Sequence, residues 1–343
     1  MKKLVALFLS LLLMLSVATA MADTLKIGIV TPDADHGFLG ESIAHARAEI
    51  EAQVAALGAG NLEYKYEVGG EAAKQIAAID NILTWDPDVI VLWPLEGEQL
   101  RNAAQTIVDA DVKLIIYDRL IDGFEGKAAE IMGDNETIGK WMGEYLLKYF
   151  KDRLDAGETL QYLLFIGDSS TVSVQRTKGM VDALEASPYA KQFVQIQESF
   201  LTNWSNATAQ DQMENWLTTT DPKTVADLDF ICTHDDEVVD GVTIAINNFT
   251  GEQNIKLVTG VGGRRETLAT YENSKIDLVT YFFSPSFIRE SIRLGIAAAK
   301  GEQYQGQDIK GQLFLIPSIE IDKTTVEAFK NSKEFTERYS IAQ

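Results

Sequence analysis

The sequence predicts an α/β protein with two doubly wound lobes, each a parallel sheet covered by helices and the two joined by crossover segments. Short runs of β-branched and aromatic residues alternate with stretches of helical period along the 343 residues. Strands that alternate with helices in this way form parallel sheets. The alternation starts a second time after residues 131–136, and the length suits two domains of ordinary size. We therefore expect one lobe from each half.

The first half carries four expected strands and three expected helices. Each strand is a short run rich in Val, Ile, Leu or Tyr, which favours β structure. The strands are expected at 25–30, 62–68, 88–95 and 112–118. Ile43, Ala46 and Ile50 recur at the spacing of one helix face, which predicts the first helix. The same period predicts helices at 72–83 and 98–110.

The second half repeats this scheme with five further strands and five helices. The strands are expected at 160–168, 193–200, 228–235, 255–261 and 277–283. The helices are expected at 174–186, 207–217, 237–248, 264–272 and 287–300. A last strand is expected near 311–321, and the late elements need not all belong to the second lobe.

Polar and aromatic side chains gather just after the expected strands. In open α/β sheets, ligands bind outside the carboxyl ends of the strands, where the strand order reverses. Carboxylates, arginines and aromatic rings dominate these positions, so we expect a binding site there. The segments are 31–38, 93–98, 118–122, 167–176, 201–206, 234–237, 260–265 and 282–287.

The N-terminus has the pattern of a secretory signal peptide. Two lysines precede an apolar run, and the small residues that follow predict cleavage after Ala22, so the signal peptide covers 1–22. The run is too short for a comfortable membrane span, and the cleavage region offers no cysteine for a lipid anchor. The single cysteine, Cys232, forms no internal disulfide. We expect a monomer in the periplasm, and the net charge of −21 disfavours nucleic acid as a partner.

No motif predicts an enzyme, a metal or a cofactor. The segment 260–266 has Arg265 where a dinucleotide fingerprint needs its third glycine. The segment 167–171 has Thr171 where a nucleophile elbow needs its last glycine. A calcium-loop pattern on the first strand end stops after Asp35. We expect no reaction and no cofactor.

Asp118 and Arg119 follow the fourth strand and suggest binding of a neutral polyhydroxylated ligand. A carboxylate accepts hydrogen bonds from two hydroxyls, and an arginine donates through a planar fork. Aromatic faces cover the C–H patches of a sugar ring. Their opposite charges would leave little net charge in the pocket, which suits a neutral ligand. The alternative is that the two residues form a surface ion pair, which contributes little to stability.

The whole chain after residue 22 resembles the type I periplasmic sugar-binding proteins, the receptors of ribose, galactose, xylose and arabinose importers. The matching motifs, in family order, are 115–119, 133–146, 175–184, 234–241, 257–263 and 298–305. Repressors that share the fold begin with a DNA-binding helix-turn-helix, which this chain lacks. The resemblance implies lobes that close on a ligand by a hinge motion and then dock on the permease of an ABC importer. The lobes implied are 23–133 plus 284–313, and 134–283 plus 314–343.

The resemblance also implies the residues of the cleft between the lobes. Phe38 and Trp204 would stack on the ligand ring, while Asp118, Arg119 and Arg176 would bind its hydroxyls. Further candidates on the first loop, on other strand ends and on a crossover are Asp33, Asp35, His36, Trp93, Asp235 and Phe283. Trp93 either lines the cleft or caps the sheet. Gly262 stands where the family has Asp or Asn, so the pocket lacks a polar side chain or has room for Arg264 or a larger ligand.

Alternatives remain beside the expected small sugar or polyol. The same fold serves a sensory receptor, and the Asp118–Arg119 pair does not exclude an amino acid or a nucleoside. An exported enzyme on a doubly wound fold is the remaining alternative. Gene neighbours would separate transport from sensing, and a ligand screen would separate the solute classes.

Overall fold

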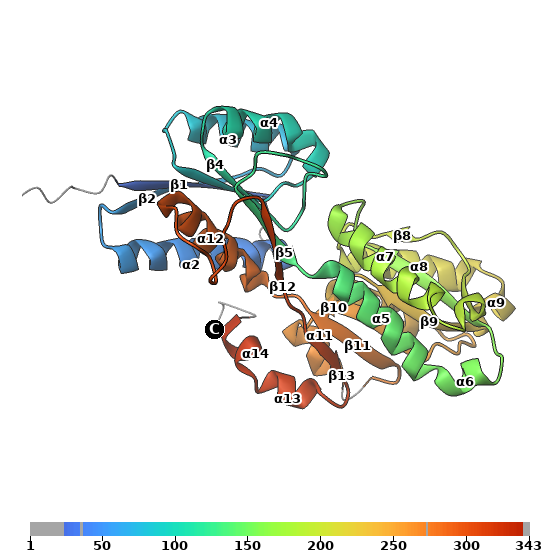
Figure 1. Cartoon of the computed structure of the whole chain (residues 1–343). Coiled ribbons are helices and arrows are strands. Elements are labelled where there is room, and N and C mark those ends of the chain that lie inside the picture. Colours follow the sequence, from blue (N-terminus) through green and yellow to red (C-terminus); the bar gives the residue numbers. More distant parts are fainter. Residues whose placement is uncertain (1–23, 35–36, 272–273, 339–343) are drawn as a thin grey trace, which may run out of the picture.

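The structure, a computed structural model, describes residues 24–34, 37–271 and 274–338. The predicted signal peptide, Asp35 and His36 lie outside these residues, so the predictions made for them remain predictions. Two lobes lie side by side, each a sheet between layers of helices (Figure 1). Among the described residues, no helix combines the length and apolar character needed to cross a membrane.

The first lobe is built on a six-stranded parallel sheet in the order β12-β5-β4-β3-β1-β2. Its strands are β1 Leu25–Thr31, β2 Leu62–Val68, β3 Val89–Leu92, β4 Lys113–Tyr117, β5 Ala129–Gly133 and β12 Gln312–Ile316. Its helices are α2 Gly37–Leu57, α3 Ala72–Leu83, α4 Gly97–Asp109 and α12 Ile288–Lys300. Helix α3 packs beside α4, and α2 beside α12 on the opposite face (Figure 1). The strand order reverses between β1 and β3, which is where such sheets bind ligands.

The second lobe has a seven-stranded sheet in the order β13-β11-β10-β9-β6-β7, with β8 also paired to β6. All strand pairs are parallel except that of β13 with β11. The strands are β6 Leu160–Ile166, β7 Phe193–Gln195, β8 Phe200–Leu201, β9 Leu228–Thr233, β10 Leu257–Gly262, β11 Asp277–Phe282 and β13 Glu320–Asp322. The strand order reverses between β6 and β9, which places a second ligand-binding edge beside that of the first lobe.

Helices pack in pairs around this second sheet, α5 with α7 and α8 with α10. The longer helices are α5 Asn135–Tyr149, α7 Thr171–Glu185, α8 Asn206–Thr219 and α10 Asp236–Asn248. The shorter helices are α6 Lys151–Asp155, η1 Ala190–Gln192, α9 Pro222–Ala226, α11 Arg265–Thr270, α13 Val326–Lys330 and α14 Lys333–Arg338. The short helix η2 Pro285–Phe287 lies on a crossover and packs against α2 and α12 of the first lobe.

The chain passes between the two sheets three times, at 134, at 283–287 and at 317–319. This confirms the predicted fold class of two doubly wound lobes joined by three crossover segments. The third passage follows Ile316, later than the expected boundary at 313, because β12 stays paired with β5 up to Ile316 and Gly133. Pro317, which lacks a backbone donor, follows at once.

Two expected strands are each divided in the structure. The segment 311–321 forms β12 in the first sheet and β13 in the second. The segment 193–200 forms β7, which pairs with the start of β6, while β8 pairs with its end. The apolar pattern is the same in either arrangement, so the sequence alone does not reveal the break.

Glycines let α5 and α7 approach closely enough to bring Arg176 to the edge of the sheet. A Cβ on Gly139 of α5 would lie 2.1 Å from the carbonyl oxygen of Arg176, and one on Gly179 of α7 would lie 2.2 Å from that of Glu136. Real Cβ atoms do not tolerate such distances, so the two helix backbones require glycine at both positions. This contact fixes the helix that carries the guanidinium of Arg176.

Candidate ligand-binding site

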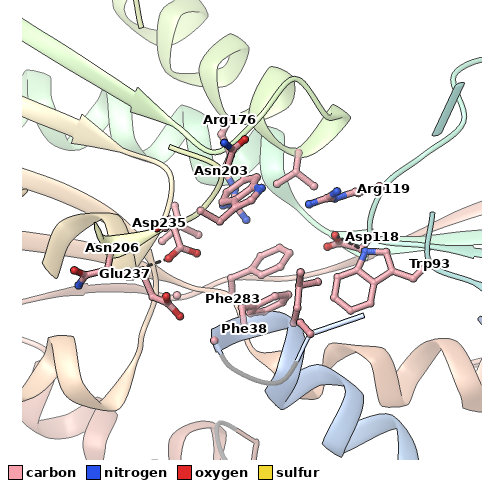
Figure 2. A pocket seen from close by; sticks show the side chains of 18 of the residues that line it. Phe38, Trp93, Asp118, Arg119, Arg176, Asn203, Asn206, Asp235, Glu237 and Phe283 are labelled. Atoms are coloured by element: carbon pink, nitrogen blue, oxygen red, sulfur yellow. Dashed lines mark hydrogen bonds between the residues drawn. The ribbon is translucent and has the colours of Figure 1, made fainter. Parts of the chain in front are cut away.

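A cavity of about 420 Å³ opens between the lobes, at the carboxyl ends of strands from both sheets. The volume is within the range of small-molecule sites. Loops after β1, β3 and β4 form one wall, and residues after β6, β8 and β9 form the other with the end of β10. Phe283, which follows β11, lies on a crossover between the lobes. Figure 2 shows charged side chains above two phenylalanine rings. The predicted residues that line the cavity are Phe38, Trp93, Asp118, Arg119, Arg176, Trp204, Asp235 and Phe283.

Asp33 is placed differently from the other predicted residues. Its side chain is exposed and lies beside Gly70, and it is not among the residues that line the cavity. Asp35 and His36, on the same loop, lie outside the described residues. Among the described residues after the first strand, Ala34 and the start of α2 line the cavity.

Three aromatic rings from different segments form a continuous wall. The ring of Phe38 lies 5.4 Å from that of Phe283 and 6.1 Å from that of Trp93, measured between centroids. Trp93 also meets Tyr117 edge to face at 5.1 Å. Trp93 thus lines the cavity and packs into the sheet core, which combines the two readings of the sequence. Such faces suit the C–H surface of a sugar or cyclitol ring.

Gln75 holds the backbone beside Trp93, and the sequence analysis did not single it out. Its amide nitrogen donates to the carbonyl of Trp93 at 2.8 Å, and its amide oxygen accepts from the N–H of Leu95 at 2.8 Å. The side chain is fully buried. A glutamine within a helical pattern gives no sequence signal of this kind, because its partners lie on the next loop.

Asp118 has an unused hydrogen-bond acceptor at the cavity. The residue adopts a left-handed backbone conformation, with φ of 64°, and is 4% exposed. Its Oδ2 accepts from the indole N–H of Trp93 at 3.1 Å, whereas Oδ1 is buried without a hydrogen-bond partner among the described residues. Burial raises the pKa of Asp118, opposed by the charges of Arg119 and Arg176. A buried orphan acceptor is costly unless a ligand supplies a donor.

Arg119 pairs with Asp168 of the opposite lobe, which the sequence analysis did not anticipate. Its guanidinium lies 3.1 Å from Asp168 Oδ2 and also donates to the carbonyl of Leu95, while its Nε has no partner among the described residues. The N–H of Leu120 donates to Thr171 Oγ1 across the same gap at 3.1 Å. Asp118 and Arg119 thus both line the cavity, and the ion-pair partner of Arg119 lies on the other lobe.

Trp204 is tied to the same carboxylate. Its indole N–H donates to Asp168 Oδ2 at 2.8 Å, and its backbone is left-handed, with φ of 61°. Gly167 makes room for the ring, since a Cβ there would lie 2.1 Å from it. Asp168 thus fixes both an expected stacking ring and a cationic side chain of the opposite lobe.

Arg176 is almost fully buried and held by protein groups. Its Nε donates to Asn135 Oδ1 at 2.9 Å, a second nitrogen donates to the carbonyl of His234, and the guanidinium lies 4.6 Å from the ring centroid of Phe283. Burial lowers the pKa of Arg176 to about 10, while Asp235 and Asp118 act against this shift. Burial, with the charge of Arg176, lowers the pKa of His234 to about 3, so this imidazole is neutral at physiological pH.

Three consecutive acidic residues begin α10 and point in different directions. Asp235 caps the helix by accepting from the N–H of Glu237 at 2.7 Å, and both side chains line the cavity. Asp236 is turned away, where it accepts from Thr280 Oγ1 and from two backbone N–H groups. From the sequence, 234–237 was expected only as a strand end, and Glu237 was not singled out. Its position at the cavity is therefore new.

Other lining residues were not predicted one by one. The polar ones are Asn203, Ser205 and Asn206. All lie in the segment 201–206 that the sequence analysis marked as a strand end, so position was the available signal. The sequence gives no signal for the direction of these side chains, because that direction depends on the left-handed backbone at Asn203 and Trp204.

Gly262 is required by its backbone and its neighbours. Its φ is 152°, and a Cβ would lie 3.0 Å from Asp236 Oδ2. Arg264 does not fill the space, because it is ion-paired with Asp240 at 2.7 Å and is not among the lining residues. The glycine therefore leaves room in the cavity.

Comparison with known proteins agrees with this architecture. The periplasmic binding protein domain family matches residues 27–303. A protein of Rhizobium meliloti, named provisionally as a rhizopine-binding protein, is 22% identical over 236 residues, which are 68% of this chain and 72% of the relative.

Solved structures match over nearly the whole chain. One from Mycobacterium smegmatis, in complex with β-D-fucofuranose, has a TM-score of 0.75 at 17% identity, covering 91% of this chain and 96% of that one. The Caulobacter myo-inositol binding protein has a TM-score of 0.73 at 20% identity, covering 91% and 97%. The family model covers most of the sequence, and the chain belongs to the periplasmic binding protein domain family.

Proposed function

We propose that this chain captures a small sugar or polyol in the cavity between its lobes and delivers it to an ABC importer. The observation that carries the proposal is Asp118, whose buried Oδ1 needs a donor within an aromatic-walled cavity. A ring with several hydroxyls supplies both the donor and the apolar faces that the walls of Phe38, Trp93 and Phe283 would cover.

The comparisons support this ligand class. Two matching structures hold a furanose sugar and a cyclitol. Both ligands are small rings with many hydroxyl groups, and the cavity of about 420 Å³ suits such sizes. Capture by hinge closure, a periplasmic location and docking on a membrane permease belong to the same proposal.

An amino acid fits the cavity less well. It would need a cation for its carboxylate, and Arg119 is already paired with Asp168 at 3.1 Å. Arg176 is engaged by Asn135 and by the carbonyl of His234. The arginines are thus committed to the protein, which favours a ligand without a carboxylate.

The test is titration calorimetry of the purified protein with pentoses, hexoses, cyclitols, nucleosides and amino acids. We expect binding of at least one sugar or cyclitol. Asp118→Asn should weaken that binding by about 2–5 kcal/mol, because a buried partner of the ligand is lost. Asp211→Asn removes the same charge from an exposed position on α8 and should have no effect. Response to amino acids or nucleosides alone would contradict the proposal.

A further inference from the structure

We propose that the preferred ligand is a polyol that carries a protonated amine, and that Asp235 and Glu237 hold the ammonium group. This rests on the proposed function and narrows its ligand class. The proposal starts from the charges that line the cavity. The lining side chains that bear charge are Asp118, Asp235, Glu237, Arg119 and Arg176.

The two arginines do not balance the three carboxylates. Arg119 is ion-paired with Asp168, a fourth carboxylate. Arg176 is therefore the cation that remains to balance both Asp118 and Asp235. Burial lowers the pKa of Arg176, and the charges of these two carboxylates and of Asp168 raise it. With the three lining carboxylates ionised, the cavity has an excess of negative charge. A neutral ligand would leave that excess uncompensated in a half-enclosed space, whereas an ammonium group would offset it.

The excess is concentrated where α10 begins. No ion pair joins Asp235 or Glu237 to a cation among the described residues, and the nearest charges along the helix are those of Asp236 and Asp240. Asp236 accepts hydrogen bonds from Thr280 and from backbone N–H groups, and Asp240 forms an ion pair with Arg264. Figure 2 shows Asp235 and Glu237 together at one end of the cavity, with Asp118 and Trp93 at the other.

The first lobe brings a further carboxyl group, Glu41, near this end. Gly37, at the start of α2 in the first lobe, faces Glu237, and a Cβ there would lie 2.7 Å from the carboxylate. Glu237 thus closes the space between the lobes. Glu41, one turn further along α2, has a buried oxygen without a hydrogen-bond partner among the described residues. Burial and the charges of Glu266 and Glu237 raise the pKa of Glu41, against the charges of Arg264 and Arg265.

Hydrogen-bond chemistry leads to the same ligand. The cavity offers acceptors at Asp118 Oδ1 and on the carboxylates of Asp235 and Glu237. The indole donors of Trp93 and Trp204 are already used within the protein, and Arg119 Nε is a donor that suits one hydroxyl of the ligand. An ammonium group supplies three donors and no acceptor, whereas a hydroxyl supplies one donor and two acceptor lone pairs. Aromatic walls also attract cations.

A protonated Asp235 is the competing arrangement. Burial and the charges of Glu237 and Asp236 raise the pKa of Asp235 far above its ordinary value. A neutral acid there would donate a hydrogen bond and suit an uncharged polyol. Asp235→Asn imitates that neutral state and keeps the helix cap, because Asn is as good an N-cap as Asp. The variant therefore separates the two arrangements without loss of the helix start.

The experiment is titration calorimetry with matched pairs that differ by one amine: glucose and glucosamine, galactose and galactosamine, scyllo-inositol and scyllo-inosamine. We expect the amine of at least one pair to bind about tenfold or more tightly than its neutral partner, the lower range for a charge pair in a desolvated site. Asp235→Asn and Glu237→Gln should each reduce that ratio by about tenfold. Asp118→Asn should weaken the binding of both members of a pair, and Asp211→Asn should change the binding of neither.

Each outcome bears on a different claim. Binding of neutral polyols with no preference for the amine would overturn this inference and leave the proposed function standing. An amine preference that survives both α10 variants would overturn the assignment to Asp235 and Glu237. Failure to bind any sugar, cyclitol or amine would overturn the proposed function and this inference together. Thermal unfolding of each variant checks that it is folded.

Discussion

Arg119 of the first lobe reaches Asp168 of the second, with a guanidinium nitrogen 3.1 Å from the carboxylate oxygen. The two side chains are 8% and 25% exposed, so the pair is largely shielded from water. The same oxygen accepts from the indole of Trp204. The ion pair therefore stabilises the arrangement in which the lobes enclose the cavity.

Asp168→Asn should weaken ligand binding. We expect a loss of about 1.5–3 kcal/mol, the usual contribution of a hydrogen bond to a charged group, because the enclosed arrangement loses a contact and Arg119 stays buried without its anion. Calorimetry measures the affinity, and small-angle scattering measures the radius of gyration with saturating ligand. Asp182→Asn breaks an exposed pair with Lys178 and should change neither. Equal behaviour of the two variants would refute the role of Asp168.

Gly133→Ala should disturb the aromatic wall. A Cβ at this position would lie 2.0 Å from the ring of Phe283, so the ring has to move. Overpacking of this kind costs about 1–3 kcal/mol of stability, and displacement of the ring should lower ligand affinity as well. Gly70→Ala is the control, since its Cβ would make only an ordinary contact. An alanine variant at 133 with unchanged unfolding and affinity would contradict the packing described.

The free energy of unfolding of the Asp240→Asn variant, relative to that of the unchanged protein, should rise as the pH rises from 5 to 8. Burial and the charge of Asp236 raise the pKa of Asp240 to about 7. A carboxyl with a raised folded pKa contributes stability below its unfolded pKa and loses it as pH rises through the folded value. Only about two pH units, from pH 5 to the folded pKa, fall within this range, so the change is about 2.7 kcal/mol. Urea unfolding at several pH values measures the difference, and a constant difference would exclude the shift.

Cys232 should not react with a thiol reagent in the folded protein. The side chain is fully buried in β9, and burial raises the pKa of its thiol to about 12, so thiolate is scarce. Labelling should occur only on unfolding, and a bound polyol should slow it by mass action. Rapid labelling without denaturant would show that β9 is accessible.

Much of the fold was predictable because strand ends in a doubly wound sheet have a known meaning. Phe38, Trp93 and Asp235 lie at the cavity because they follow strands, and strand position is written in local apolar runs. The pairing of Arg119 with Asp168 was not predictable, since it joins separate lobes and depends on how these face each other. The support of Trp93 by Gln75 was missed for another reason, since it joins a helix to the following loop of the same lobe and leaves no mark in the helical pattern.

The division of residues 311–321 shows a different limit. Apolar alternation indicates a strand but does not say in which sheet the strand lies, and β12 and β13 belong to different sheets. Pro317 was the available clue, because proline interrupts a ladder of backbone hydrogen bonds.

The position of β12 affects how the protein is made. The first sheet receives its edge strand, and one of its faces receives α12, from residues that follow the whole of β6–β11. A nascent chain that has emerged only to residue 283 contains neither of these pieces, so the face of the first sheet beside α2 is only partly covered. The first lobe is therefore completed only after the strands β6–β11 of the second lobe have been synthesised. The contacts that complete the first lobe join residues far apart in the sequence, which slows folding.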